Sequence, residues 1–104
     1  MIKVRISKKD NVIQSIHCKG HAMYDDYGKD IVCASFSTMI ITTINAILEF
    51  DKEAVSYTDT NDLKIINIKK DNITNGLLNN LVHMIKELKE NYDKNINVKE
   101  ENHE

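Results

Sequence analysis

The feature that most constrains the fold is a stretch without charged residues, from Ile31 to Leu48, in a chain of which 29% is charged. It is just long enough to be considered as a membrane-spanning helix. Hydroxyl and amide groups that face lipid would each need a hydrogen-bonding partner, however, and the stretch contains Ser35, Ser37, Thr38, Thr42, Thr43 and Asn45. We therefore predict a helix buried in the core of a soluble protein, and we expect no membrane partner.

This helix is predicted to begin after Asp30, because an aspartate is a good N-cap. Apolar or small residues then recur at helical spacing, at Cys33, Ser37, Ile40, Ile41, Ile44, Ile47 and Leu48. Since nearly all of its faces are apolar, we expect it to be the central helix of the fold.

Two strands are predicted before this helix. Residues 2–7 alternate apolar with polar side chains, which is the period of a strand with one buried face. A turn is expected at residues 8–11, and the β-branched residues of 12–19 predict a second strand that pairs back on the first. The hairpin brings Gly20 and His21 to its end.

The second half of the chain predicts another hairpin and a second helix. Residues 55–58 and 63–68 are β-branched runs separated by turn formers at 59–62. Thr74 is expected to cap a helix that covers either the sheet or the first helix with the apolar residues Leu77, Leu78, Leu81, Val82, Ile85, Leu88 and Tyr92. Residues 95–99 alternate as a last strand, whereas residues 100–104 are too polar to pack and are expected to fray.

The predicted order is therefore strand, strand, helix, strand, strand, helix, strand. This order indicates an α+β fold, an α/β sandwich in which a mainly antiparallel sheet packs against two helices. A chain of 104 residues suits a single domain, which we place at residues 1–99.

Composition and charge narrow the range of functions. Fourteen basic against sixteen acidic residues give a net charge of −2, so the chain lacks the strongly basic footprint of a nucleic-acid binder and no direct nucleic-acid partner is expected. Residues 1–5 alternate apolar and cationic side chains instead of forming the apolar run of a secretory signal. We therefore expect a cytoplasmic protein, in which Cys18 and Cys33 would stay reduced.

Cys33 occupies a position that can activate a thiol. Cysteine reacts as the thiolate, which is scarce at neutral pH unless the surroundings favour the anion. With Asp30 as N-cap, Cys33 is the third residue of the helix, where backbone N–H groups and the helix dipole favour negative charge. The same amides are expected to bind an oxyanion. Asp30 adds an opposing charge near the thiolate, and the imidazolium of His21 would offset it if the intervening loop folds back.

Other residues near this pair predict supporting roles. Gly20 suits a sharp backbone turn or a close approach to a substrate. Ser37 lies one turn after Cys33 and can orient the substrate or the pair, although a serine more often bonds to a carbonyl of its own helix.

The segment 23–29 follows no apolar period and predicts a flexible loop with Gly28 as its pivot. Two tyrosines lie in it, Tyr24 and Tyr27. They either cover a bound peptide or pack the loop down, and the sequence does not decide between these roles.

Two alternatives compete with a catalytic Cys33. A cysteine among apolar helix residues is commonly a small buried hydrophobe, which we expect of Cys18 and which stays open for Cys33. A zinc site could use His17, Cys18, His21 and Cys33. The strand neighbours His17 and Cys18 point to opposite faces, however, so we expect no metal and no cofactor.

The segment Gly20-His21-Ala22, a short loop, and Gly28-Lys29-Asp30-Ile31-Val32-Cys33-Ala34-Ser35 with Ser37 one turn later together resemble the ribosomal-processing cysteine protease family, Prp. The chain length, the hairpin before the histidine and the two helices are also similar to that family, over residues 1–99. One departure is Ser35-Phe36, where the family more often has small residues.

The resemblance implies a cysteine endopeptidase with Cys33 as nucleophile, His21 as general base, Asp30 and Ser37 in support, and the loop as a substrate-gated lid. It implies that the substrate is the N-terminal extension of bacterial large-subunit ribosomal protein number twenty-seven, and that the protein supports ribosome assembly as a homodimer. The alternative is a non-catalytic, ribosome-associated module that binds protein through the same groove. Selective labelling of Cys33 over Cys18 would distinguish the two.

Overall fold

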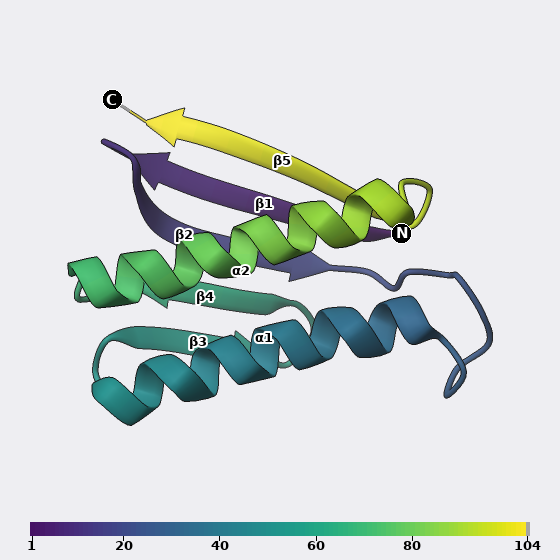
Figure 1. Ribbon diagram of the computed structural model, residues 1–104, viewed down its shortest axis with the longest axis horizontal. Helices are drawn as coiled ribbons and strands as arrows, with labels where there is room; N and C mark the ends of the chain where they lie inside the picture. The colour runs from purple at the N-terminus through teal and green to yellow at the C-terminus, as the bar shows by residue number, and fades with distance from the viewer. Residues whose placement is uncertain (104) are drawn as a thin grey trace.

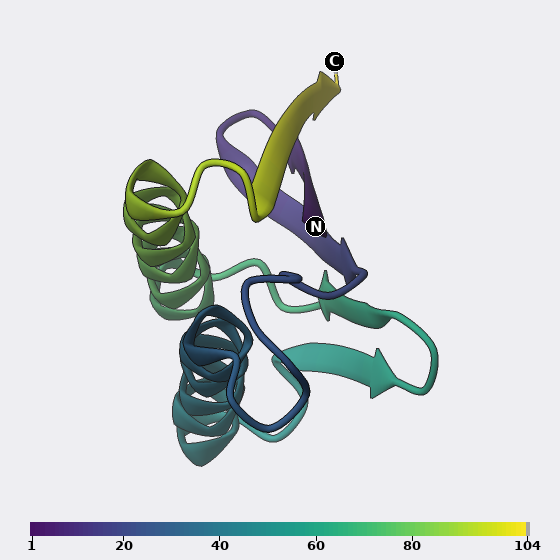
Figure 2. The ribbon, with the colours of Figure 1, turned by 90° about the vertical axis from the view of Figure 1, so that its right-hand side faces the viewer.

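The computed structural model describes residues 1–103 and contains a five-stranded sheet covered on one face by two helices (Figures 1 and 2). The strands are β1 (Ile2–Lys9), β2 (Val12–Lys19), β3 (Val55–Asp59), β4 (Leu63–Asn67) and β5 (Ile96–His103). The helices are α1 (Ile31–Phe50) and α2 (Asn72–Asn91). The predicted fold class and order of elements are confirmed.

The sheet has the strand order β3-β4-β2-β1-β5 (Figure 1). All neighbouring pairs are antiparallel except β1 and β5, which are parallel. The alternation of β1 is confirmed, because Ile2, Val4 and Ile6 are all buried beneath the helices. The turn after β1 is tighter than predicted: residues 8 and 9 still belong to the strand, and the chain reverses at Asp10 and Asn11, both at positive φ.

Helix α1 is a surface helix, so the prediction that it is central was wrong. It faces the sheet and α2 with Val32, Phe36, Ile40, Thr43, Ile44 and Ile47, while Ile41 is 59% and Phe50 71% exposed. The other helix lies beside it on the same sheet face, which leaves its outer side uncovered (Figure 2). In residues 1–103 it is also the one helix long and apolar enough to cross a membrane, a weak indication because core helices meet the same criterion.

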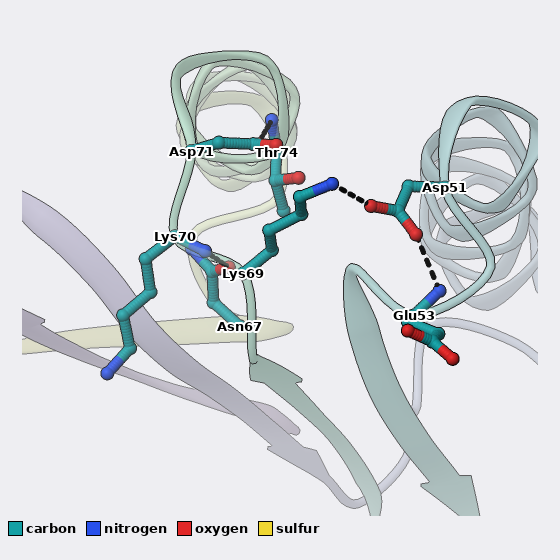
Figure 3. A network of polar contacts seen from close by, with 7 residues as sticks. All are labelled: Asp51, Glu53, Asn67, Lys69, Lys70, Asp71 and Thr74. Atoms are coloured by element: carbon teal, nitrogen blue, oxygen red, sulfur yellow. Dashed lines mark hydrogen bonds and ion pairs between the residues drawn. The ribbon is translucent and has the colours of Figure 1, made fainter.

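Helix α2 begins one turn earlier than predicted. Its N-cap is Asp71, whose Oδ1 accepts the Thr74 N–H at 2.9 Å (Figure 3), so the prediction that Thr74 is the cap was wrong. The predicted apolar stripe is confirmed by the burial of Leu78, Leu81, Val82 and Ile85. It covers both the sheet and α1, since the helix contacts β2, β5 and α1.

A polar network joins the two helices at the end of the molecule where α1 ends and α2 begins (Figures 1 and 3). Asp51, which follows α1, accepts hydrogen bonds from the Lys69 ammonium and from the Glu53 N–H, the second at 2.9 Å. The side chain of Asn67 is buried and donates to the Ile13 carbonyl at 2.9 Å. These contacts hold the connections at this end of the molecule, and the longer loop between β2 and α1 lies at the opposite end (Figure 1).

The end of the chain differs from its prediction. Residues 100–103 continue β5 instead of fraying, and they pair in parallel with Ile6 to Lys9 of β1. Backbone pairing requires no apolar side chains, and Glu100 gains the ammonium of Lys86 at 2.7 Å and that of Lys8 at 3.7 Å. The last predicted tail residue, Glu104, lies outside the described residues.

Candidate active site

A cavity of about 780 Å³ lies where β2 ends and α1 begins. Its walls are the loop that joins these elements, the first turns of α1 and the turn between β3 and β4. The structure brings most of the predicted site residues to this one cavity: Gly20, His21, Tyr27, Gly28, Asp30, Cys33 and Ser37.

Cys33 lies in the first turn of α1, as predicted, and its side chain is half-buried. Its Sγ accepts a hydrogen bond from the backbone N–H of Ala22 at 3.2 Å. The imidazole of His21 opens onto the same cavity, but in residues 1–103 no hydrogen bond joins this ring to the sulfur. The group that holds the thiol is therefore the amide that follows His21 in the chain.

Gly20 sets the path of the chain into the site. It has φ +86°, a left-handed conformation that strains other residues. A Cβ atom here would lie 2.4 Å from the carbonyl oxygen of Met1. The predicted sharp turn is thus confirmed, and the close neighbour that the structure shows is the chain's own first carbonyl group, whereas the approach to a substrate stays a prediction.

The Asp30 carboxylate holds both the helix and the loop. Its Oδ1 accepts the N–H groups of Val32 and Cys33, each at 3.0 Å, and its Oδ2 accepts those of Tyr24 at 3.0 Å and Asp25 at 3.4 Å. Partial burial raises the pKa of this carboxyl, but the four backbone donors outweigh that effect and hold its pKa below the usual range. Asp30 is therefore an ionised anchor for the loop.

These bonds correct one expectation. The first-turn amides of Val32 and Cys33 were expected to bind an oxyanion, but both already donate to Asp30. The next amide, that of Ala34, donates to the Asp30 carbonyl at 3.0 Å. The donor that points at the sulfur comes instead from the loop.

The two loop tyrosines have different surroundings. Tyr24 packs the loop down, because its ring meets that of Tyr92 edge to face with centroids 5.3 Å apart. Tyr27 is fully exposed and lies at the cavity beside Gly28, which has φ +85°. The loop is thus fixed near Tyr24 and free of such packing near its tip.

The other thiol, Cys18, also contributes to the cavity lining, whereas the neighbouring His17 does not. Cys18 is buried, as predicted, and burial raises its pKa to about 12. His17 points to the opposite face of the sheet and lies 3.2 Å from the Asp62 carboxylate. In the part of the chain that the structure describes, no group of three or more His, Cys, Asp or Glu side chains could hold a metal ion.

Comparison with known proteins decides the family. The family model for the cysteine protease Prp matches residues 1–97, which is nearly the whole chain. The chain belongs to the Prp family of cysteine proteases. The ribosomal processing cysteine protease Prp of Staphylococcus aureus is 28% identical over 102 residues, which cover 92% of this chain and 95% of that relative.

Solved structures of Prp from S. aureus share the fold. The complex with a covalently linked product peptide has a TM-score of 0.90 and 26% identity, and the match covers 97% of this chain and all of that one, 100%. The complex with a substrate peptide has a TM-score of 0.85 and 24% identity over the same shares of 97% and 100%. The resemblance inferred from the sequence motif is confirmed.

Two residues of α1 that follow Cys33, Phe36 and Ser37, line the wall of the cavity. Ser37 is exposed at the cavity, one turn after Cys33, while the hydrogen bond to a carbonyl of the same helix is made by Ser35, at 2.7 Å from the Ile31 oxygen. Phe36 is 7% exposed and contributes to both the core and the cavity.

Two groups of the site had no signal in the sequence. One is the Ala22 N–H, since every residue other than proline carries such a donor and its direction depends on the fold. The other is Asn95, whose Nδ2 donates to the Ala22 carbonyl at 2.9 Å from 73 positions away in the chain. The Ala22 N–H belongs to the peptide group between His21 and Ala22, and Asn95 holds the next peptide group, between Ala22 and Met23.

Proposed function

We propose that this Prp family member is a cysteine endopeptidase in which Cys33 is the nucleophile and His21 the general base. The observation that carries the proposal is the hydrogen bond from the Ala22 N–H to Cys33 Sγ. An N–H group aimed at the sulfur gives a stronger hydrogen bond to an attacking sulfur that carries negative charge than to a neutral one. His21 immediately precedes this amide and lines the same cavity as Cys33, which makes it the candidate for the base.

The proposed cycle uses these groups in order. The thiolate of Cys33 attacks the scissile carbonyl carbon, and the Ala22 N–H, held 3.2 Å from the sulfur, is the donor that we propose for the developing oxyanion. The imidazolium of His21 protonates the departing amine as the peptide C–N bond breaks and leaves a thioester on Cys33. His21 then deprotonates a water that hydrolyses the thioester, which releases the acid product and restores the thiol–imidazole pair.

The cavity suits an extended peptide. Phe36, Ile40 and Ile41 supply an apolar wall along α1, while Asp25 and Asp59 lie at its polar edges. This combination favours peptides that carry both apolar and basic side chains. We propose that residues 25–29, at the less firmly attached end of the loop, close as a lid over such a peptide and bring His21 onto Cys33.

The substrate that we propose is the N-terminal extension of large-subunit ribosomal protein number twenty-seven, so that the protein supports ribosome assembly. Support comes from the S. aureus relative, which is named as a ribosomal processing protease, and from its structures with bound peptides. The cytoplasm is the place of action that we propose, because this substrate is made there.

The proposal is tested by incubating the purified protein with the extended ribosomal protein and following the shortened product by mass spectrometry. Cys33→Ala should abolish trimming, and His21→Ala should slow it about 100- to 10,000-fold. Cys18→Ala, which removes the buried thiol, and His83→Ala, which removes an exposed histidine of α2, serve as controls and should keep the activity. Trimming at full rate by Cys33→Ala would refute the proposal, and binding without cleavage by the parent protein would favour a non-catalytic module.

We also propose that the protein acts as a homodimer. This proposal follows the resemblance to the Prp family, and Ile31 and Phe50 of α1, which are 53% and 71% exposed, offer apolar surface to a second copy of the chain. Light scattering after size exclusion should give twice the chain mass of 12.0 kDa. A monomer at all accessible concentrations would contradict this proposal without affecting the catalytic one.

A further inference from the structure

Asn95 connects the far end of the chain to the active site. It lies between α2 and β5, in a turn whose backbone is held on both sides. Its carbonyl accepts the Ile2 N–H and its own N–H donates to the Tyr92 carbonyl, each at 2.9 Å. With its backbone fixed in this way, its side-chain amide donates to the Ala22 carbonyl at 2.9 Å.

Ala22 needs this partner. The residue is 1% exposed, and a buried carbonyl without a hydrogen bond is costly. The next residue, Met23, has φ +57°, a left-handed conformation that persists in a non-glycine residue only when its neighbours hold it. By this hydrogen bond the Asn95 amide holds the peptide group between Ala22 and Met23.

The backbone N–H group of Ala22 points into the active site. Its N–H donates to Cys33 Sγ at 3.2 Å, and His21 precedes it in the chain. A rotation of the backbone at Ala22 would therefore move the donor away from the sulfur and turn the imidazole at the same time.

We propose that Asn95 is a positioning residue of this site: by holding the Ala22 carbonyl it directs the Ala22 N–H at Cys33 and sets the direction of His21. The catalytic part of this role rests on the proposed protease function, whereas the effect on Cys33 does not. The contact between Tyr24 and Tyr92 attaches the same turn to the loop at a second point.

The first test compares two leucine variants. Asn95→Leu removes the donor at similar volume, and Asn91→Leu is its control, because Asn91 makes an equivalent side-chain bond to the exposed Glu87 carbonyl at 3.3 Å, away from the site. We expect alkylation of Cys33 at pH 7 to slow about fivefold in Asn95→Leu, the effect of one hydrogen bond of typical net strength. Asn91→Leu should react at the parent rate.

A second variant separates positioning from stability. In Asn95→Asp the ionised carboxylate cannot donate a hydrogen bond, whereas the protonated acid can. With 4,4′-dithiodipyridine as the thiol probe, the rate of the variant relative to the parent should rise toward one as the pH falls from about 6 to about 3, through the ordinary pKa of an aspartic acid. If Asn95 served stability alone, the folded variants would react at the parent rate at every pH, and the proposal would be wrong.

Measuring peptide cleavage beside Cys33 labelling distinguishes a failure of the protease proposal from a failure of the positioning role of Asn95. Because Asn95 does not line the cavity, Asn95→Leu should lower kcat about fivefold and leave KM unchanged. If the parent cleaves nothing but the Cys33 labelling rates change as expected, the protease function fails and the positioning role stands. If the parent cleaves and Asn95→Leu matches it in labelling and in kcat, the positioning role fails.

Discussion

Replacing Gly20 with alanine should destabilise the protein and disturb the active site together. The chain contains three glycines, and they form a graded series. Gly20 is left-handed and crowded, Gly28 is left-handed with no atom within 4 Å of its hypothetical Cβ, and Gly76 is helical with equally open surroundings. Three alanine variants therefore separate the effect of backbone conformation from that of crowding.

The magnitudes follow from the structure. A left-handed backbone costs a non-glycine residue roughly 1–2 kcal/mol, which both Gly20→Ala and Gly28→Ala incur. In Gly20→Ala the new Cβ also starts 2.4 Å from the Met1 oxygen, and moving that backbone group should cost roughly 1–3 kcal/mol more. Gly76→Ala should instead stabilise the protein by about 0.5–1 kcal/mol, because alanine favours a helix.

Urea unfolding of the three variants measures these free energies, and alkylation of Cys33 under native conditions reports the site. We expect Gly20→Ala to lose the most stability and to label Cys33 more slowly, since the shift reaches His21 and Ala22 directly. Gly28→Ala should label at nearly the parent rate. A Gly20→Ala variant no less stable than Gly28→Ala would refute the reasoning about the Met1 contact.

Three further predictions concern the helix, the cap and the thiols. Ile44→Ala should cost about 2–5 kcal/mol and the exposed Ile41→Ala less than about 1 kcal/mol in urea unfolding, and equal losses would contradict the described face of α1. Because the pKa of Asp30 is lowered in the fold, its contribution is present above the unfolded pKa and is lost as the pH falls through the folded pKa. Asp30→Ala should therefore lower the urea midpoint at pH 7 but hardly at about pH 2, and a pH-independent loss would argue against an ionised cap. Iodoacetamide should modify native Cys33 at least about 100-fold faster than Cys18, whose pKa is about 12, and comparable native rates would contradict an accessible thiol at Cys33.

The strands and the start of α1 could be predicted because their signals are local. Alternation placed Ile2, Val4 and Ile6 on one buried face, and an aspartate before an apolar run placed the N-cap at Asp30. The motif then located the candidate cavity and the family.

The errors occurred where the deciding contacts are distant in sequence. Helix α1 is apolar on almost every side, so its period could not show that Ile40 and Ile44 face inward while Ile41 faces out. Thr74 and Asp71 are both good caps, and the choice depends on where the chain leaves β4. The polar residues after Lys99 pair with β1, which lies at the other end of the chain.

The site itself divides in the same way. The placement of His21 and Cys33 at one cavity could be predicted from residue type and spacing, and their catalytic roles stay a proposal. The direction of the Ala22 N–H could not be predicted, because a backbone donor has no sequence signal. The hydrogen bond from Asn95 to the Ala22 carbonyl could not be predicted either, because the two residues are 73 positions apart. The capping role of Asp30 was predictable. Only the structure shows its consequence, which is that Asp30 occupies the amides that were expected to bind an oxyanion.

The most direct test of the central claim is a search for the thioester on Cys33. The protein is mixed with excess extended ribosomal protein, quenched in acid after milliseconds to seconds, and analysed by intact mass and peptide mapping. We predict an adduct that adds the mass of the N-terminal extension minus one water, located on Cys33 and absent from Cys33→Ala, and a lasting adduct if His21→Ala slows hydrolysis more than acylation. Trimmed product that forms without any adduct and equally well in Cys33→Ala would contradict the account.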